Sequence, residues 1–401
     1  YGGTKAVSHT QLFQMIIIFS GLFAAAFMVI RMLPENIGFV DALHIAGKME
    51  KLNLIDTKFD WDNKYNIWSG IIGGFFLQLS YFGTDQSQVG RYLTGSSVTQ
   101  SRLGLVMNGF VKIPMQFFIL LIGTLVFVFY QFHQPPVFFN QVEVNNIKNS
   151  AYSEDYKRLE AEYLELHSGK LVHLQDLKTG IDRGDEKLIN DSRANLQTAE
   201  RKEKVIRKEV TDLLLKNNSL ADINDTNYVF LNFVTKNLPV GMIGLLIAII
   251  FLASMGSTAS GLNSLASTTV IDIYKRLINK EADSHNYLTF SRWATVGWGI
   301  FCVIIAVYAG KMGNLLEAVN ILGSLFYGTI LGIFVVAFYM KNIGGKAVFY
   351  SALLAEVFVF TSWLLDLTAF LWLNVIGCLL VMGFSFLIQR FIFPRIEIRN
   401  S

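Results

Sequence analysis

Hydroxyl side chains recur at helical spacing inside a very apolar stretch of the sequence, between Phe251 and Arg276. Ser257, Ser260, Ser264 and Ser267 lie three or four residues apart, so on a helix they share one face with Ala253. Hydrocarbon offers such a face no hydrogen-bond partner, so the face must contact protein or a small hydrated cation. Two interpretations remain open: close helix packing through small residues, and an alkali-ion site, which we favour.

The composition indicates a membrane protein, because 52% of the 401 residues are hydrophobic and the mean hydropathy is +0.41. Two cysteines are too few for a disulfide framework or a cysteine-based metal site. Eight windows are apolar enough to cross a hydrocarbon core of about 30 Å. They are 11–33, 66–84, 103–132, 238–269, 288–309, 315–339, 347–364 and 369–392.

Lysine and arginine in the short loops predict which side of the membrane each loop occupies. A cytoplasmic N-terminus puts the basic short loops and the basic tail inside, and it puts the loop at 34–65 outside. We therefore expect a multi-pass protein of the cell (inner) membrane. The inside residues are Arg91, Arg102, Lys275, Arg276, Lys280, Lys341, Lys346, Arg390, Arg395 and Arg399.

Residues 141–225 interrupt the membrane pattern, since they are rich in Lys, Glu, Asp and Asn. Helical spacing over 154–174 and 185–216, with a turn at 180–184, predicts an extracytoplasmic helical hairpin. Charges of both signs indicate a solvated surface rather than a nucleic-acid-binding tract. The hairpin is a candidate surface for an extracytoplasmic partner.

Three blocks resemble the sodium:solute symporters, the family that includes the sodium/glucose cotransporters. They are YGGTKAVSHTQLFQ at the start, SYFGTDQSQVGRYLTG followed by VTQSRLGLVMNGFVK, and ASMGSTASGLNSLASTTVIDIYKR. Their order and spacing match throughout, apart from residues 141–225. The resemblance implies an all-α fold of five plus five inverted-repeat helices, with broken helices holding ion and substrate at mid-membrane.

The resemblance also divides the chain into regions. Residues 11–33, 66–88, 103–132 and 238–275 become core helices five to eight, and the next two windows become nine and ten. The first four core helices are missing, so we expect this sequence to be the later part of a longer protein that does not transport by itself. The regions are the core at 1–140 with its external loop at 34–65, the hairpin insertion at 141–225, the core at 226–340, and two accessory helices with a cytoplasmic tail at 341–401.

The ion site implied by the resemblance lies on the eighth core helix. The positions that match sodium ligands are Ala253, Gly256 and Ser257, and Gly256 departs from the pattern because it supplies no hydroxyl. One hydroxyl ligand is therefore absent unless Ser254, Thr258 or Ser260 compensates. Neutral oxygens suit a hard cation such as Na⁺. Members with a second sodium site have an aspartate where this sequence has Gln11, so we expect one coupling ion.

The substrate site implied by the resemblance lies between core helices six, seven and ten. Gln78 aligns with an asparagine that binds sugar, Tyr81 with a gating tyrosine, and Lys112 with a lysine that also contacts the sugar. Asn320 is the candidate on helix ten, and Asp85 is a structural or gating residue. Alternatives remain, because Lys112 could extend to the inner surface and Gln78 could join two helices.

The sequence thus predicts a sodium-coupled symporter, not an enzyme, that imports a small polar solute, with a sugar favoured. Sialic acid, a monocarboxylate or an amino acid are alternative substrates, and a symporter-like sensor or receptor is an alternative class. The string at 343–349, IGGKAVF, lacks the spacing of a phosphate-binding loop, which argues against an ATP-driven pump. The expected partners are the solute and the lipid bilayer, with no nucleic acid.

Overall fold

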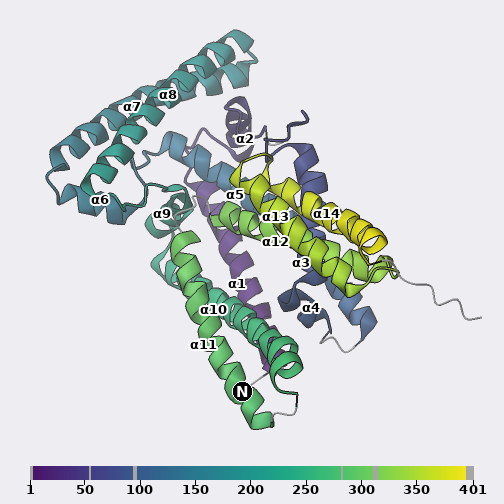
Figure 1. The fold of residues 1–401 in the computed structure, drawn as a ribbon. Coiled ribbons are helices and arrows are strands. Elements are labelled where there is room, and N and C mark those ends of the chain that lie inside the picture. The colour runs from purple at the N-terminus through teal and green to yellow at the C-terminus, as the bar shows by residue number, and fades with distance from the viewer. Residues whose placement is uncertain (1–2, 54–55, 94–96, 281–282, 310–314, 394–401) are drawn as a thin grey trace, which may run out of the picture. The chain divides into compact units, whose positions relative to one another are not determined.

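Helices form nearly all of the regular structure in this computed structural model, which describes residues 3–53, 56–93, 97–280, 283–309 and 315–393 (Figure 1). The structure does not describe the side chains of residues 3–12, and Gln11 is one of these residues. The described residues contain one isolated β-bridge, between Asp56 and Asn66, and no strand. The all-α class predicted from the sequence is confirmed.

Seven helical segments of the described residues are long and apolar enough to cross a membrane. The eighth expected window, 66–84, is helical from Ile67 to Thr84 but is not one of the seven, because glycine, serine and glutamine dilute its apolar residues. The seven are Phe13–Arg31, Val98–Phe132, Val240–Ile278, Ser284–Tyr308, Glu317–Tyr339, Gly345–Leu364 and Phe370–Phe391.

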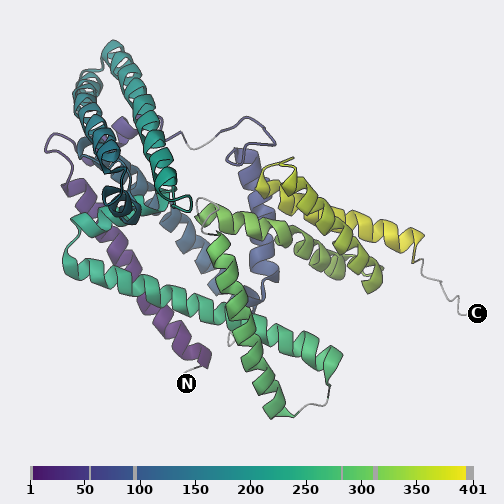
Figure 2. The ribbon, with the colours of Figure 1, turned by 60° about the vertical axis from the view of Figure 1, so that its left-hand side comes forward.

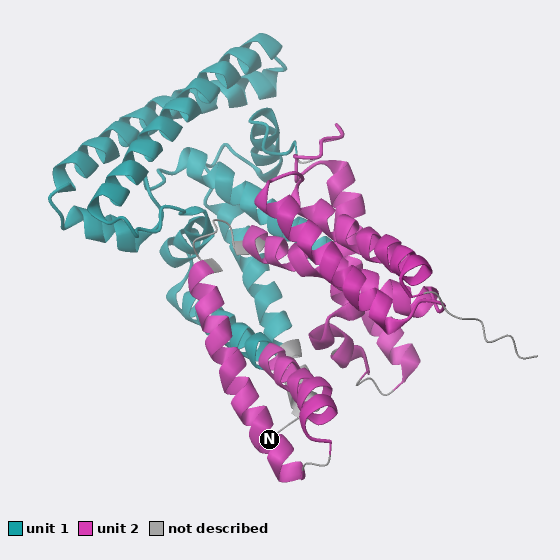
Figure 3. Cartoon of the chain, in the orientation of Figure 1, with its two compact units in different colours: residues 1–54, 108–259 teal, residues 55–107, 260–401 magenta. Residues whose placement is uncertain are grey.

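Packing groups the chain into two units, residues 1–54 with 108–259 and residues 55–107 with 260–401 (Figure 3). Two long helices, α5 (Val98–Phe132) and α10 (Val240–Thr268), begin in one unit and end in the other. This grouping follows contacts rather than order in the sequence. The division into core, insertion and accessory regions stays a prediction.

The first unit packs α1 (Gly3–Arg31), α2 (Phe39–Lys48), the second half of α5 and α9 (Val229–Asn237) around one apolar core. The short helix η2 (Thr226–Tyr228) leads into α9. Val29, Leu125 and Phe233 are fully buried in this core. Gly21 of α1 meets α10, because a Cβ atom at Gly21 would clash with the side chain of Leu246.

The predicted helical hairpin is present in the first unit. It consists of α7 (Ser153–Arg183) and α8 (Glu186–Asn217), which lie side by side in both ribbon views, with the short α6 (Gln141–Lys148) before them (Figure 2). Gly184 ends α7 with a φ of 66°, a conformation that glycine adopts without strain. Asp185 then caps α8 by accepting hydrogen bonds from the backbone N–H groups of Lys187 and Leu188.

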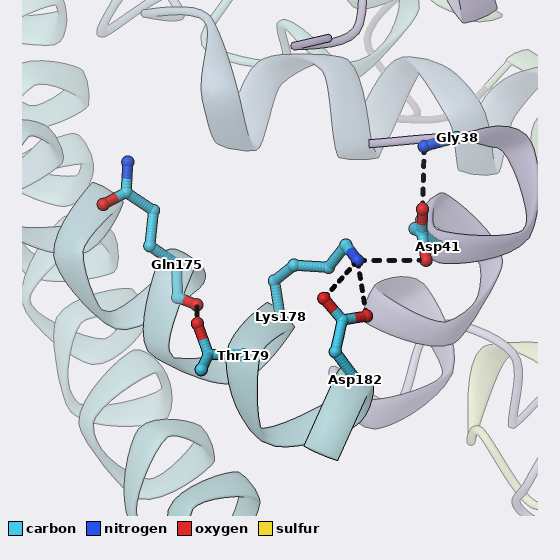
Figure 4. A network of polar contacts seen from close by, with 6 residues as sticks. All are labelled: Gly38, Asp41, Gln175, Lys178, Thr179 and Asp182. Carbon is cyan, nitrogen blue, oxygen red and sulfur yellow. Dashed lines mark hydrogen bonds and ion pairs between the residues drawn. The ribbon is translucent and has the colours of Figure 1, made fainter. Parts of the chain in front are cut away.

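Ion pairs attach the tip of the hairpin to α2 (Figure 4). Lys178 Nζ lies 3.3 Å from Asp41 Oδ1 and 2.5 Å from Asp182 Oδ1. The Gly38 N–H donates to Asp41 Oδ2 at 2.9 Å, and this bond, together with Lys178, lowers the pKa of Asp41 despite its partial burial. The hairpin is therefore anchored to the loop that precedes the sixth predicted core helix.

Eight helical segments lie wholly within the described residues of the second unit. They are η1 (Ser69–Gly73), α3 (Gly74–Thr84), α4 (Gln86–Leu93), η3 (Thr269–Ile278), α11 (Ser284–Ala309), α12 (Leu315–Tyr339), α13 (Gly345–Leu364) and α14 (Phe370–Phe391). The helices α12 and α14 pack most extensively, and α13 and α3 pack against them.

Glycines bring the backbones of α12 and α14 into contact. A Cβ atom at Gly328 would lie 2.5 Å from the carbonyl oxygen of Asn374, and one at Gly377 would lie 2.9 Å from the backbone nitrogen of Thr329. Gly332 meets Val381 and Cys378 in the same way. Small residues allow such close approach between membrane helices, so this part of the glycine series serves packing.

We expect Gly377→Val to destabilise the protein by about 1–3 kcal/mol, because the added side chain must displace backbone. Gly383→Val on the same helix is the matched control, since a Cβ atom at Gly383 meets nothing within 4 Å. Thermal unfolding of both variants in detergent measures the effect. Equal unfolding temperatures would contradict the close contact.

His167 makes the stability of the hairpin depend on pH. The side chain is 3% exposed, and burial, followed by the charge of Lys170, lowers its pKa to about 4. Between about pH 6.5 and pH 4, the unfolded chain therefore binds a proton at His167 more readily than the folded chain does. Stability is complete above pH 6.5 and falls by at most about 3 kcal/mol as the pH drops to 4.

His167→Leu should flatten this pH dependence, whereas His173→Gln on the same helix retains His167 and should keep it. Chemical denaturation of each variant between pH 4 and pH 7 provides the comparison. A His167→Leu protein that loses stability as steeply as the unchanged protein would contradict the assignment.

Candidate ion and substrate site

The four predicted sodium residues all lie on α10. Ala253, Gly256, Ser257 and Ser260 occupy positions i, i+3, i+4 and i+7, so they form one face of a regular helix. The helix changes to π geometry at Thr269, where η3 begins. Thr269 Oγ1 accepts a hydrogen bond from Trp298 Nε1 of α11 at 2.9 Å, which joins the two segments.

This face of α10 offers space and oxygen atoms. A Cβ atom at Gly256 would meet no atom within 4 Å, and the Ser257 side chain is exposed among the described residues. Ser254, about a quarter turn away, donates to the carbonyl oxygen of Phe251 at 3.2 Å. Hydroxyl and carbonyl oxygens at this spacing can bind a hard monovalent cation. The ligand role of each residue stays a prediction.

The predicted substrate residues of the sixth core helix lie on α3. Gln78 is exposed and Tyr81 half-buried, one turn apart on the same helix. The helix ends where Asp85 adopts an extended backbone (φ −70°, ψ 119°), and α4 begins at Gln86. The segment is therefore a broken helix, as the resemblance implies for a site region.

Asp85 stabilises this break. Its Oδ1 atom accepts hydrogen bonds from the backbone N–H of Ser87 at 2.8 Å, the Ser87 hydroxyl at 2.5 Å and the backbone N–H of Gln88 at 3.3 Å. Its Oδ2 atom accepts from the Tyr327 hydroxyl of α12 at 3.3 Å. These contacts favour the structural part of the prediction for Asp85, whereas a gating role stays a prediction.

Three residues that the sequence reasoning missed, Gln88, Tyr327 and Ser80, complete this cluster. Gln88 Nε2 donates to the Tyr81 hydroxyl at 2.8 Å, and the rings of Tyr81 and Tyr327 lie 6.3 Å apart. The buried Ser80 hydroxyl donates to the carbonyl oxygen of Tyr327 at 2.8 Å. The available signal for Tyr327 was its place between Gly323 and Gly328, two helical turns after Asn320.

Asn320 and Lys112 complete the predicted set. Asn320 is exposed near the start of α12, in the same unit as Gln78 and Tyr81. Lys112 is exposed on α5, two residues before the proline that lies inside this helix, and it belongs to the other unit. The structure thus brings Tyr81 and Asp85 into one hydrogen-bonded cluster, to which Gln78 and Asn320 add exposed amides on the same two helices.

Comparisons with known proteins bear on the family and the fold. Residues 215–355 match the model of the sodium:solute symporter family. The sodium/iodide cotransporter of Homo sapiens is 30% identical over 129 residues, which are 32% of this chain and 20% of that protein. The sodium/glucose cotransporter of Vibrio parahaemolyticus is 22% identical over 355 residues, which are 86% of this chain and 51% of that protein.

A solved structure of a Na⁺-coupled sialic acid symporter, in a substrate-bound outward-open state, has the same fold. The TM-score is 0.64 at 17% sequence identity, and the match covers 97% of this chain and 63% of that one. The described residues share an almost entirely helical fold with that structure, and seven of their helical segments are long and apolar enough to cross a membrane. The chain is similar to the sodium:solute symporter family, whose model matches residues 215–355.

The chain spans 20% of the length of the sodium/iodide cotransporter and 51% of the length of the sodium/glucose cotransporter. The family likeness confirms the resemblance seen in the sequence and the inverted-repeat fold. It does not select a sugar among the possible solutes.

Replacing Asp85 tests the hydrogen bonds at the break. Asp85→Ala removes every acceptor and should lower stability by about 0.5–2 kcal/mol, as loss of a cap does. Asp85→Asn retains one side-chain oxygen and should be milder. Thermal unfolding in detergent ranks the two variants. The assignment fails if both variants unfold at the same temperature as the unchanged protein.

Proposed function

We propose that this chain forms part of a sodium-coupled secondary active symporter that imports a small polar organic solute by alternating access, with a sugar as the preferred class. One observation supports it most strongly: Ala253, Gly256, Ser257 and Ser260 share a face of an apolar helix. The exposed Ser257 hydroxyl on this face is an oxygen ligand of the kind that a partly dehydrated Na⁺ binds.

Gln78 and Asn320 support the solute class. Exposed amides both donate and accept hydrogen bonds, which suits a polyhydroxylated or otherwise polar molecule. In this proposal Lys112 contacts the solute as well, and Tyr81 closes over it. A carboxylated solute such as a sialic acid or monocarboxylate is the second candidate, because the ammonium of Lys112 would pair with its carboxylate.

One sodium ion is enough to drive accumulation. Moving one charge across about 100 mV releases ~2.3 kcal/mol, and a tenfold concentration gradient adds ~1.4 kcal/mol. Together these sustain a solute gradient of several hundredfold. We assign the protein to the cell (inner) membrane, with the α7–α8 hairpin on the extracytoplasmic side, where it is available to a partner.

An uptake assay tests the function. Proteoliposomes that contain the full-length protein are offered labelled sugars, sialic acid, monocarboxylates and amino acids. We expect uptake of one class to require an inward sodium gradient. A protein that binds one of these solutes but moves none under any gradient would instead be a sensor.

Ser257→Ala should raise the sodium concentration for half-maximal uptake about tenfold, which corresponds to ~1.4 kcal/mol of lost ion binding. Thr124→Ala is the matched control, because that hydroxyl donates to a carbonyl oxygen of its own helix, α5, and is not a candidate ion ligand. Equal sodium dependence in the two variants would move the ion site away from this face.

A further inference from the structure

A cavity lies in the first unit, among α5, α7, α8 and α9, and has a volume of about 360 Å³. This size is within the range of about 300–1,000 Å³ that is typical of small-molecule sites. Five aromatic side chains line it, namely those of Phe127, Tyr130, Phe139, Tyr163 and Phe230. None of the predicted ion or solute residues lines it.

Two opposite charges lie in the wall of this cavity. Lys170 Nζ lies 2.9 Å from Glu203 Oε2, and their side chains are only 3% and 14% exposed. The contact is a single hydrogen bond, although the ammonium has three donors and the carboxylate two acceptor atoms. This pair can therefore accept further polar groups from a ligand.

The neighbouring ion pair shows the opposite arrangement. Arg207 Nη2 bonds to both oxygens of Asp225 at 2.7 and 2.8 Å, and Asp225 also accepts from the backbone N–H of Phe139. These contacts fix the carboxylate of Asp225 to structural partners. The Lys170–Glu203 pair remains the charged pair in the cavity wall.

Gln131 adds an unsatisfied acceptor to the same wall. Its side chain is 6% exposed, and its Oε1 atom has no hydrogen-bond partner among the described residues. A buried acceptor without a donor is costly, so a ligand N–H at this position would stabilise the protein. His167, close to Lys170, is neutral at physiological pH because its pKa lies at about 4. It therefore adds no charge to the Lys170–Glu203 pair.

We propose that this cavity binds a free α-amino acid with an apolar or aromatic side chain. The ligand carboxylate pairs with Lys170, its ammonium pairs with Glu203 and donates to Gln131, and its side chain lies among the aromatic rings. A zwitterion matches a wall that holds one charge of each sign. A net anion or cation would add a buried charge that no group of opposite sign compensates.

The test is calorimetric titration of the full-length protein in detergent with L-phenylalanine, without sodium. We expect saturable binding that weakens at least tenfold for 2-phenylethylamine, which lacks the carboxylate, and for 3-phenylpropanoate, which lacks the ammonium. L-leucine and L-tryptophan extend the probe set. Absence of binding by all three amino acids, or equal binding of the truncated analogues, would overturn the proposal.

Variants locate the site. Lys170→Met and Glu203→Gln should each weaken L-phenylalanine binding at least tenfold, and Glu209→Gln, an exposed change on the same helix, should not. If a single variant fails to fold, the double variant Lys170→Met with Glu203→Met removes both charges together and should also weaken binding at least tenfold. Unchanged affinity in a folded Lys170→Met protein, or in the folded double variant, would show that binding occurs elsewhere.

Discussion

Hydrocarbon supplies no hydrogen-bond partners, and the arrangement of the membrane helices depends on that constraint. Polar groups in the spans must find partners within the protein or bind an ion. Ser80 bonds to a carbonyl of α12, and Asn374 donates to Ser324 across the α12–α14 contact at 2.8 Å. The break between α3 and α4 is possible because Asp85 accepts the hydrogen bonds that continuous helix would otherwise supply. In the proposed ion site, the exposed Ser257 hydroxyl of α10 binds a cation.

Close backbone contact is the second requirement of such a structure. Gly328, Gly332 and Gly377 let α12 and α14 approach at backbone distance, which aligns the polar residues between them. Outside the spans, the helices are held by the interactions that are usual in water-soluble proteins. Asp185 caps α8, and Gly184 forms the turn of the α7–α8 hairpin. Lys178 attaches the hairpin to α2 through its ion pair with Asp41.

Local patterns allowed much of the fold to be predicted from the sequence. The long apolar windows, the charged helical segments and the glycine turn at 180–184 each depend on residues close together in the chain, and the seven spans and the hairpin follow them. The window at 66–84 was misjudged because a broken, glycine-rich helix is less apolar than a simple span. Contacts between distant residues could not be predicted, so Tyr327, which meets Asp85 from 242 positions away, was missed. The Lys170–Glu203 pair likewise depends on the register between two antiparallel helices.

Sodium binding at α10 is the central claim, and equilibrium binding of radioactive ²²Na⁺ to the purified full-length protein tests it most directly. The account predicts saturable binding to one site per protein, weakened about tenfold by Ser257→Ala and unaffected by equal concentrations of K⁺. Saturable binding with the same affinity in the Ser257→Ala protein, or absence of saturable binding in the unchanged protein, would contradict it.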